Sequence, residues 1–320
     1  MQAIDNVLLL GGTGFVGSAT CEALIERFGA ARLVVPSRRP ARAKHLLPLP
    51  GLELVQADVH DDADLARLVA GRSAVVNLVA ILHGDAAAFE RVHVALPRRL
   101  ARACAAAGVR RVVHVSALGA APDAPSNYQR SKAGGEAALR GAAGLELTVL
   151  RPSVIFGAGD RFLNTFAGLQ HVFPVVPLAA AQARFQPVWV EDVAAAIVRC
   201  LEDPATAGQT YELAGPHVYT LAELVRLAGR WSGHERPVCA LPEPLGRLQA
   251  ALMGLAPGEP LLSGDNLDSM RVPNVASGTL PGLAALGITP AALEAVGPSY
   301  LDRHRGVRRL DAFRALARRR

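Results

Sequence analysis

A short apolar run, Val7 to Leu10, leads directly into a glycine-rich turn, Gly11-Gly12-Thr13-Gly14-Phe15-Val16-Gly17, and a helical stretch follows up to Arg27. Glycines let the backbone turn sharply and approach a pyrophosphate, whose charge then faces the positive end of the following helix. The glycines alone are weak evidence, but the strand before them and the helix after them support a nucleotide-binding turn. A glycine-rich turn without a ligand is the alternative.

Apolar strand-like runs alternate with helical segments through the first half of the chain. The expected strands are 7–10, 33–35, 52–56, 74–79, 112–115 and 147–150, and the expected helices are 15–27, 63–68, 89–107 and 128–140. This alternation predicts an α/β protein with a doubly wound parallel Rossmann sheet and helices on both faces. The ligand of such a sheet is expected outside the carboxyl ends of the strands.

The pattern loosens after residue 151. Residues 186–190 and 210–213 resemble returning strands on either side of a helix at 192–201, and short helices are expected at 221–231 and 245–255. We therefore expect a nucleotide-binding Rossmann domain from residues 1–155 plus 186–215. A smaller, mostly helical lobe for a substrate or partner is expected from residues 156–185 plus 216–300, over the ligand edge of the sheet.

The positive charge of the chain is concentrated at its end. The net charge is +6, and residues 303–320 alone hold eight arginines and one acidic residue, so the remainder is close to neutral. Leu310, Phe313 and Ala317 follow helical spacing in this basic tail (301–320), which is typical of a helix that lies on an anionic membrane or docks on an acidic partner. A solvated terminus is the alternative. Nucleic acid is not expected, because no aromatic platform or known binding module accompanies the charge.

Composition indicates a globular protein of the reducing cytoplasm. Hydrophobic residues make up 51% of the chain, yet the most apolar stretch, 74–82, is too short to span a membrane. No basic residue precedes the N-terminal apolar run, so we expect no signal peptide. The four cysteines lie far apart without metal-site spacing and are expected to be reduced, and no metal is expected. Peripheral attachment to the inner face of the cell membrane is the alternative location.

The end of the second strand indicates which nucleotide is preferred. It reads Pro36-Ser37-Arg38-Arg39, and no acidic residue occurs between Glu26 and Glu53. An acid here would bond the ribose 2′-hydroxyl of NAD, whereas arginine pairs with the 2′-phosphate of NADP. The sequence therefore favours NADP(H), with a solvated basic loop as the alternative. Asp58-Val59, after the third strand, is placed to meet adenine, and Leu78-Val79-Ala80, after the fourth, to line the adenosine and ribose.

Tyr128 and Lys132 lie one helical turn apart on the same face of an expected helix. Only two of the 34 basic Lys and Arg residues are lysines, which makes this pairing informative. A nearby ammonium favours the phenolate, so that tyrosine can exchange a proton with a substrate oxygen at moderate pH. An ordinary helix pair is the alternative.

Together the glycine turn and the Tyr128-x-x-x-Lys132 pair resemble the extended or atypical short-chain dehydrogenases/reductases over about residues 4–215. In active members of that family, a Ser or Thr at the end of the fifth strand bonds the substrate oxygen. Here that position falls on Ala117 or Leu118, and neither carries a hydroxyl. Ser116 is close by and is a possible catalytic group beside Tyr128 and Lys132, but its place indicates that it packs beside the cofactor.

A narrower resemblance follows from Val115 to Ala120, from the run Arg151-Pro152-Ser153-Val154-Ile155-Phe156-Gly157-Ala158-Gly159-Asp160, and from Pro187 to Val193. These segments resemble the branch that contains the NADPH-binding accessory subunit of respiratory complex I, within the NAD-dependent epimerase/dehydratase-like proteins. The resemblance implies a peripheral subunit in which the nucleotide is a structural ligand, with respiratory complex subunits as partners. An active NADPH-dependent oxidoreductase acting on a quinone, isoprenoid or sugar-type carbonyl is the alternative.

The residues expected to contact the nucleotide lie in the glycine turn, at the strand ends and on the Tyr-Lys helix. They are Gly11, Thr13, Gly14, Phe15, Val16, Gly17, Ser37, Arg38, Arg39, Asp58, Val59, Leu78, Val79, Ala80, Val115, Ser116, Ala117, Tyr128, Lys132, Arg151, Pro152, Ser153 and Val154. Asp160 and Arg161 are expected to organise the loop over the cofactor or to form a simple loop ion pair. His114, inside an apolar strand, is expected to be a bonded core residue.

Overall fold

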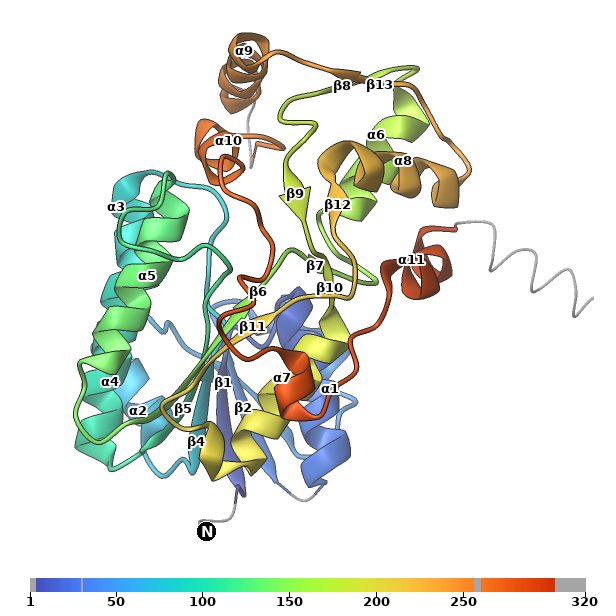
Figure 1. Cartoon of the computed structure of the whole chain (residues 1–320). Coiled ribbons are helices and arrows are strands. Elements are labelled where there is room, and N and C mark those ends of the chain that lie inside the picture. Colours follow the sequence, from blue (N-terminus) through green and yellow to red (C-terminus); the bar gives the residue numbers. More distant parts are fainter. Residues whose placement is uncertain (1–3, 30, 256–259, 303–320) are drawn as a thin grey trace, which may run out of the picture.

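The computed structural model describes residues 4–29, 31–255 and 260–302, so the basic tail from Arg303 onward lies outside the described residues. Its centre is a parallel sheet in the order β11-β6-β5-β4-β1-β2-β3 (Figure 1). The strands are β1 (Asn6–Leu10), β2 (Arg32–Ser37), β3 (Leu52–Gln56), β4 (Ala74–Asn77), β5 (Arg111–Val115), β6 (Glu146–Pro152) and β11 (Thr210–Leu213). The chain adds strands outward on one side of β1 (β2 and β3) and then crosses to the other side (β4 onward), and this switch between β1 and β4 is that of a Rossmann fold. The predicted fold class is confirmed.

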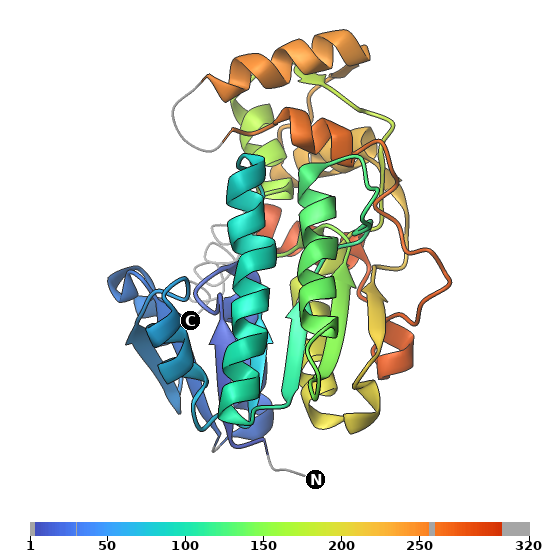
Figure 2. The same ribbon diagram turned by 90° about the vertical axis from the view of Figure 1, so that its left-hand side faces the viewer.

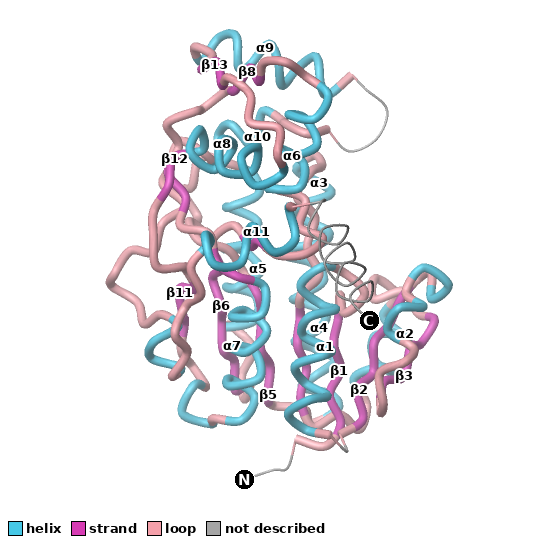
Figure 3. Tube along the Cα trace, turned by 90° about the vertical axis from the view of Figure 1, so that its right-hand side faces the viewer, coloured by secondary structure: helices cyan, strands magenta, loops and turns pink. Residues whose placement is uncertain are grey.

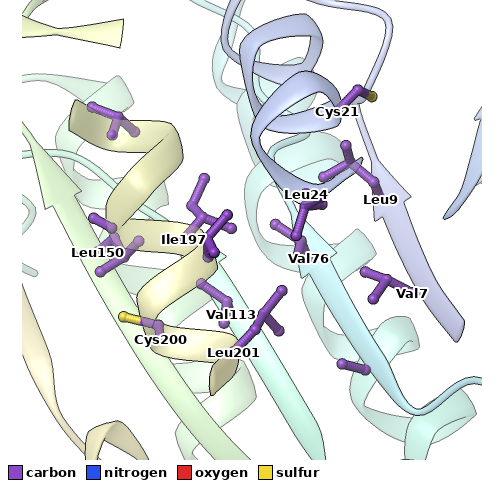
Figure 4. Packing of buried hydrophobic residues seen from close by; sticks show 14 of the residues in the cluster. Val7, Leu9, Cys21, Leu24, Val76, Val113, Leu150, Ile197, Cys200 and Leu201 are labelled. Atoms are coloured by element: carbon purple, nitrogen blue, oxygen red, sulfur yellow. The ribbon is translucent and has the colours of Figure 1, made fainter. Parts of the chain in front are cut away.

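Helices cover both faces of the sheet because alternate strand residues point to opposite sides. On one face lie α1 (Phe15–Phe28) and α7 (Val190–Glu202), and on the other lie α2 (Asp62–Val69), α4 (Leu96–Ala107) and α5 (Asn127–Arg140) (Figures 2 and 3). Figure 4 shows the core on the α1 and α7 side, where Leu9, Val76 and Val113 of the sheet meet Leu24 and Ile197 of the helices. A second apolar core fills the space on the other side, so both faces of the sheet are buried.

The element boundaries agree closely with the sequence in this half of the chain, with two differences. The helix expected over 89–107 is in fact three segments: α3 (Ala86–Phe89), a π-helix η3 (Glu90–Ala95) and α4. The strand expected over 186–190 is only β10 (Val188–Trp189), which pairs with β7 (Ile155–Phe156) outside the main sheet. Short 3₁₀ turns follow β2 and α7, at η1 (Pro40–Arg42), η2 (Lys44–Leu46) and η4 (Pro204–Thr206).

A second lobe lies over the carboxyl ends of the strands (Figure 1). Its helices are α6 (Leu163–Val172), α8 (Leu221–Ser232), α9 (Glu243–Gly254), α10 (Gly264–Ser269) and α11 (Leu293–Leu301). Two small ribbons join them, β8 (Val176–Leu178) with β13 (Val238–Ala240) and β9 (Arg184–Phe185) with β12 (Tyr219–Thr220). The lobe has its own core, in which Leu163 of α6 and Leu224 of α8 are buried.

The chain returns from this lobe to the sheet between residues 271 and 291, a segment that we call the return segment. Asn274 accepts hydrogen bonds from Ser153 and Val154, and the buried Glu212 of β11 accepts two from Ser277. Leu283 and Leu286 of η5 (Leu283–Leu286) join the core beneath α7. The expected division assigned these residues to the lobe, but they pack at the edge of the sheet.

Candidate functional site: a nucleotide cleft at the carboxyl ends of the strands

The glycine turn between β1 and α1 is packed too closely for side chains. A Cβ on Gly17 would lie 2.3 Å from the Gly11 carbonyl oxygen, and Gly11 adopts a φ of +84° that favours glycine. Gly14 caps α1 with no side-chain hydrogen bond, and the first turn of α1 carries no acidic residue. By contrast, Asp61 and Ser126 cap α2 and α5 through their side chains. The first amides of α1 are thus left for an anion, and the turn fits a dinucleotide pyrophosphate.

The loop after β2 carries two free cations. Arg38 and Arg39 are exposed, and neither forms an ion pair with any residue of the described chain. The Ser37 hydroxyl accepts a hydrogen bond from the Arg39 amide, which holds the loop in a tight turn. After β3, one oxygen of Asp58 accepts from the His60 amide at 3.0 Å, and Val59 is half-buried beside it. The structure thus presents all five expected residues at neighbouring strand ends.

The segment after β4 closes the other side of the turn. Leu78 donates its amide to the Leu10 carbonyl, and a Cβ on Gly11 would lie 3.1 Å from the Leu78 carbonyl carbon. Val79 donates to the buried Asn77 side chain, and Ala80 is exposed. Leu78 and Val79 therefore border the glycine turn, and Ala80 follows them; that these three residues line the adenosine and ribose stays a prediction.

His93 links this segment to the helix that carries Tyr128. Its Nε2 accepts from the Ile81 amide at 3.0 Å, so the ring proton lies on Nδ1, which donates to Ser131 Oγ at 2.8 Å. Burial and the Lys132 charge lower the pKa of His93 to about 3, so the ring is neutral. His93, Phe89 and Tyr128 also form an aromatic cluster, in which the His93 and Tyr128 rings meet edge-on with centroids 5.6 Å apart.

The π-helix brings His93 into this position, and two glycines of α5 accommodate it. A Cβ on Gly135 would lie 2.1 Å from the His93 carbonyl oxygen, and a Cβ on Gly134 would lie 2.9 Å from Val94 Cγ2. The two segments therefore run in close contact, side by side (Figure 2). This contact was not anticipated from the sequence, although the Gly-Gly pair inside a helix was the available signal.

Tyr128 and Lys132 lie on one face of α5, but the phenol is not activated in this arrangement. Burial raises the pKa of Tyr128 to about 12. Lys132 is only 2% exposed, and burial lowers its pKa to about 8 against the opposing effect of Glu136. Its Nζ donates to the Val115 carbonyl at 2.8 Å. The expected lowering of the phenol pKa is therefore not seen, and burial is the cause of its upward shift.

The end of β5 has no hydroxyl at the position where active reductases carry one. Ala117 and Leu118 are both buried, and Leu118 donates its amide to the Pro152 carbonyl. The Ser116 hydroxyl is buried and has no hydrogen-bond partner in the described structure. His114, on the same face of β5, is a core residue as expected, and its Nδ1 is bonded to the Asn77 side chain at 3.2 Å.

The residues at the end of β6 are held by other parts of the protein. The Arg151 guanidinium forms two hydrogen bonds with the buried Glu136 carboxylate of α5, at 2.8 and 2.7 Å. Its side chain is thus directed to α5, and the predicted contact of Arg151 with the nucleotide stays a prediction. Pro152 ends β6, and Ser153 and Val154 are held by Asn274 of the return segment.

Asp160 organises the loop that follows β7, and the expected place of this loop over the cofactor stays a prediction. Its buried carboxylate accepts from the amides of Gly157, Phe162 and Asn164, and from the hydroxyl of Tyr300 at 2.8 Å. The hydrogen bond from Tyr300 holds α11 against this loop.

Asp265 connects α10 to the N-terminus of α5 and was not anticipated from the sequence. Its two carboxylate oxygens accept from the amides of Asn127 and Tyr128, at 2.7 and 3.0 Å. A carboxylate at this end also complements the helix dipole. Because the donors and the acceptor are 137 and 138 residues apart, no local pattern could have revealed the pair.

Comparison with known proteins identifies the family. Residues 7–214 match the NAD dependent epimerase/dehydratase family. The chain belongs to this family. The matched residues include the glycine turn, the Tyr128–Lys132 helix and all seven strands of the sheet except the first residue of β1.

Relatives within this family share most of the chain. It is 34% identical over 95% of its length to the NADH dehydrogenase (ubiquinone) 1 alpha subcomplex subunit 9, mitochondrial, of Mus musculus, and covers 81% of that protein. It is 30% identical to the ceramide reductase of Caulobacter vibrioides, over 74% of each chain. The Escherichia coli quinone oxidoreductase QOR2, solved with NADPH, shares the fold with a TM-score of 0.74 at 24% identity, covering 92% of this chain and 99% of that one. The predicted resemblance is confirmed.

Within the described ranges there is no cluster of three or more His, Cys, Asp or Glu side chains that could hold a metal ion. All four cysteines are free. The helices of the described chain include none that is both long enough and apolar enough to cross a membrane.

Proposed function

We propose that this protein binds NADP(H) in the cleft above β1, β2 and β4 and holds it as a structural ligand. The observation that carries the choice of nucleotide is the pair Arg38 and Arg39, exposed and unpaired in the described structure where an NAD site would place an acid. The uncapped N-terminus of α1 supports binding of the pyrophosphate beside them.

An accessory rather than a catalytic role is supported by the end of β5. Ala117 and Leu118 are buried and leave the substrate oxygen without a hydroxyl donor at this position. Relatives that cover most of the chain are named as subunits of NADH dehydrogenase. On this reading the nucleotide stabilises the folded state by mass action, by about 2.7 kcal/mol at a hundred times its Kd.

Nucleotide titration of an Arg38→Ala/Arg39→Ala variant tests the assignment. Each charge-assisted hydrogen bond to the 2′-phosphate is worth about 1.5–3 kcal/mol, so NADPH binding should weaken by about 10- to 100-fold or more, with little change for NADH. Arg226→Ala, at an exposed arginine of the lobe, is the control. Equal losses for the two nucleotides would exclude the 2′-phosphate contact.

An active NADPH-dependent oxidoreductase is the second candidate, and the Tyr128–Lys132 pair favours it. NADPH would supply the hydride. The raised pKa keeps the Tyr128 phenol protonated, as a group that donates a proton to a substrate oxygen must be, and Ser116 or water would replace the missing hydroxyl. Tyr128→Phe separates the two roles. If the variant folds and binds NADPH but no longer complements a deletion strain, the purely structural role is refuted.

Association with a respiratory complex at the inner face of the membrane is the corresponding proposal for partner and location. Affinity purification from membrane and soluble fractions tests it. Stoichiometric recovery with NADH dehydrogenase subunits is expected, and a soluble protein recovered alone would favour the enzyme. The basic tail proposed to contact an anionic surface lies outside the described residues, so its deletion is a separate arm of this experiment.

A further inference from the structure

The C-terminal ends of α6 and α8 bring two histidines together in the lobe (Figure 1). His171 is the penultimate residue of α6, and His234 follows α8 by two residues. His171 Nδ1 and His234 Nε2 lie 3.1 Å apart, and the two rings are nearly perpendicular, with centroids 4.5 Å apart. His171 is exposed and His234 is half-buried, so solvent reaches both rings. We call them the α6–α8 histidine pair, and the proposed function does not use it.

One ring of the pair is oriented by the backbone. His234 Nδ1 lies 3.0 Å from the Ser232 carbonyl oxygen, which can only accept a hydrogen bond, so Nδ1 carries the proton. In the neutral ring, Nε2 then presents its lone pair toward His171. A histidine whose other nitrogen donates to a backbone carbonyl is the usual arrangement of a metal ligand, because this bond fixes both the tautomer and the direction of the ring.

The positions of the two rings fit two ligands of one ion better than a straight hydrogen bond. An aligned N–H···N bond of this length would place both nitrogens and both ring centroids on one line, with the centroids about 5.4 Å apart. Two imidazoles that bind one ion at about 2.05 Å, with their nitrogens 3.1 Å apart, form an angle of about 98° at the ion and hold the centroids about 4.8 Å apart. The observed 4.5 Å is closer to the second arrangement.

The surroundings of the pair hold both rings in place. Gln170, the residue before the histidine of α6, is fully buried, and its side-chain amide donates to the Val225 carbonyl of α8 at 2.7 Å and accepts from the Arg236 amide at 3.1 Å. His234 donates its backbone amide to the Gly229 carbonyl at 2.8 Å. A Cβ on Gly229 would lie 2.1 Å from Gln170 Oε1, so the two helices are in close contact. These bonds position the rings independently of the contact between them, as a preorganised site requires.

We propose that the α6–α8 histidine pair binds one divalent transition-metal ion of the zinc type through His171 Nδ1 and His234 Nε2. Imidazole nitrogen suits such ions, whereas Mg²⁺ and Ca²⁺ take oxygen ligands. The described part of the chain offers no third His, Cys, Asp or Glu ligand here, so water fills the remaining positions. The Arg236 guanidinium donates to the Gln170 carbonyl and adds positive charge nearby, so we expect moderate rather than tight affinity. The ion would link α6 to the segment after α8 and stabilise the folded lobe.

Titration of the full chain, free of any purification tag, with ZnCl₂ by isothermal titration calorimetry tests the site. The wild type should bind one ion, and His171→Gln and His234→Gln should each weaken binding at least tenfold. His217→Gln is the matched control, because His217 is an exposed histidine of the same lobe whose ring contacts Tyr219 instead of a second histidine.

Thermal unfolding gives a second measurement on the same variants. Zn²⁺ should raise the unfolding midpoint of the wild type and of His217→Gln, but not that of His171→Gln, because the cross-link between α6 and the segment after α8 needs both rings. NADPH binding should be unchanged in all variants, since the pair lies in the lobe and takes no part in the nucleotide cleft. This keeps the test separate from that of the proposed function.

Two outcomes would overturn the proposal. One is the absence of saturable Zn²⁺ binding by the wild type up to about 1 mM ZnCl₂, which would leave the two histidines as a hydrogen-bonded pair only. The other is Zn²⁺ binding of equal strength in His171→Gln and His217→Gln, which would place the ion elsewhere on the chain.

Discussion

Replacing Gly135 with alanine should destabilise the protein although it improves the helix propensity of α5. An added Cβ would lie 2.1 Å from the His93 carbonyl oxygen, whereas ordinary contacts begin near 3.4 Å, so α5 or the π-helix would have to move by about 1 Å. Overpacking of this kind costs about 1–3 kcal/mol, and the upper end applies because the obstacle is backbone. The propensity gain of about 1 kcal/mol offsets part of this. A net loss of about 2 kcal/mol is expected.

Urea unfolding with intrinsic fluorescence measures this loss, and Gly134→Ala is the matched control. A Cβ added at Gly134 would meet the side chain of Val94, with Cγ2 at 2.9 Å, and no backbone atom is among its nearest neighbours, so we expect stability within about 1 kcal/mol of the wild type. Because α5 carries Tyr128 and Lys132, NADPH binding should also weaken in Gly135→Ala alone. If the two alanine variants are equally stable, the close contact between α5 and the π-helix is refuted.

Two further predictions concern groups that the sequence could not fully interpret. Lys132 has a pKa of about 8 in the folded protein against about 10.5 in the unfolded state, so the unfolded state binds more protons between these values and the wild type gains stability as the pH rises through them. In urea unfolding, the stability of Lys132→Met relative to the wild type should therefore fall by up to about 3 kcal/mol between pH 7.5 and 10.5. A difference that stays constant with pH would contradict the buried ammonium. Asp265→Ala should lower the free energy of unfolding by about 1–2 kcal/mol, because α5 loses this cap. Hydrogen exchange should accelerate at the amides of Asn127 and Tyr128 but not at Gln129, whose amide still donates to Ser126. Uniform acceleration along α5 would point instead to general unfolding.

The sheet was predictable because its signals are local. Buried parallel strands are continuous apolar runs, as in Val7 to Leu10 of β1. At the two edges of the sheet, the expected bounds of 52–56 and 210–213 agree with β3 and β11 residue for residue. The π-helix was not predictable, since the apolar pattern over 89–107 continues through it and a single added residue per turn does not interrupt that pattern. Gln186 to Val190 looked like a strand because it is apolar, but Gln186 bonds Asn274 and Gly215 instead of the sheet.

The candidate site was predictable where the residue type itself limits the local structure or chemistry. It was less predictable where contacts with residues distant in the sequence determine the direction or the pKa of a side chain. The glycine turn was predictable because a side chain at these positions would collide with the backbone of the turn. The absence of a hydroxyl at Ala117 and Leu118 was visible in the sequence alone. The direction of Arg151 was not, because it depends on Glu136, whose carboxylate lies on another element. The phenol pKa of Tyr128 likewise depends on burial by residues that surround it only in the folded chain.

The return segment has a consequence for the order in which the protein can be completed during synthesis. Ser153 and Val154, at the rim of the nucleotide cleft, bond Asn274, while the buried Glu212 bonds Ser277 and the buried Asp192 accepts from Ala291. A nascent chain that has exposed only the first 220 residues therefore contains every strand of the sheet but lacks these partners, so water must hydrogen-bond these groups until the return segment emerges. We therefore expect this edge of the sheet to reach its final form only after the return segment has left the ribosome.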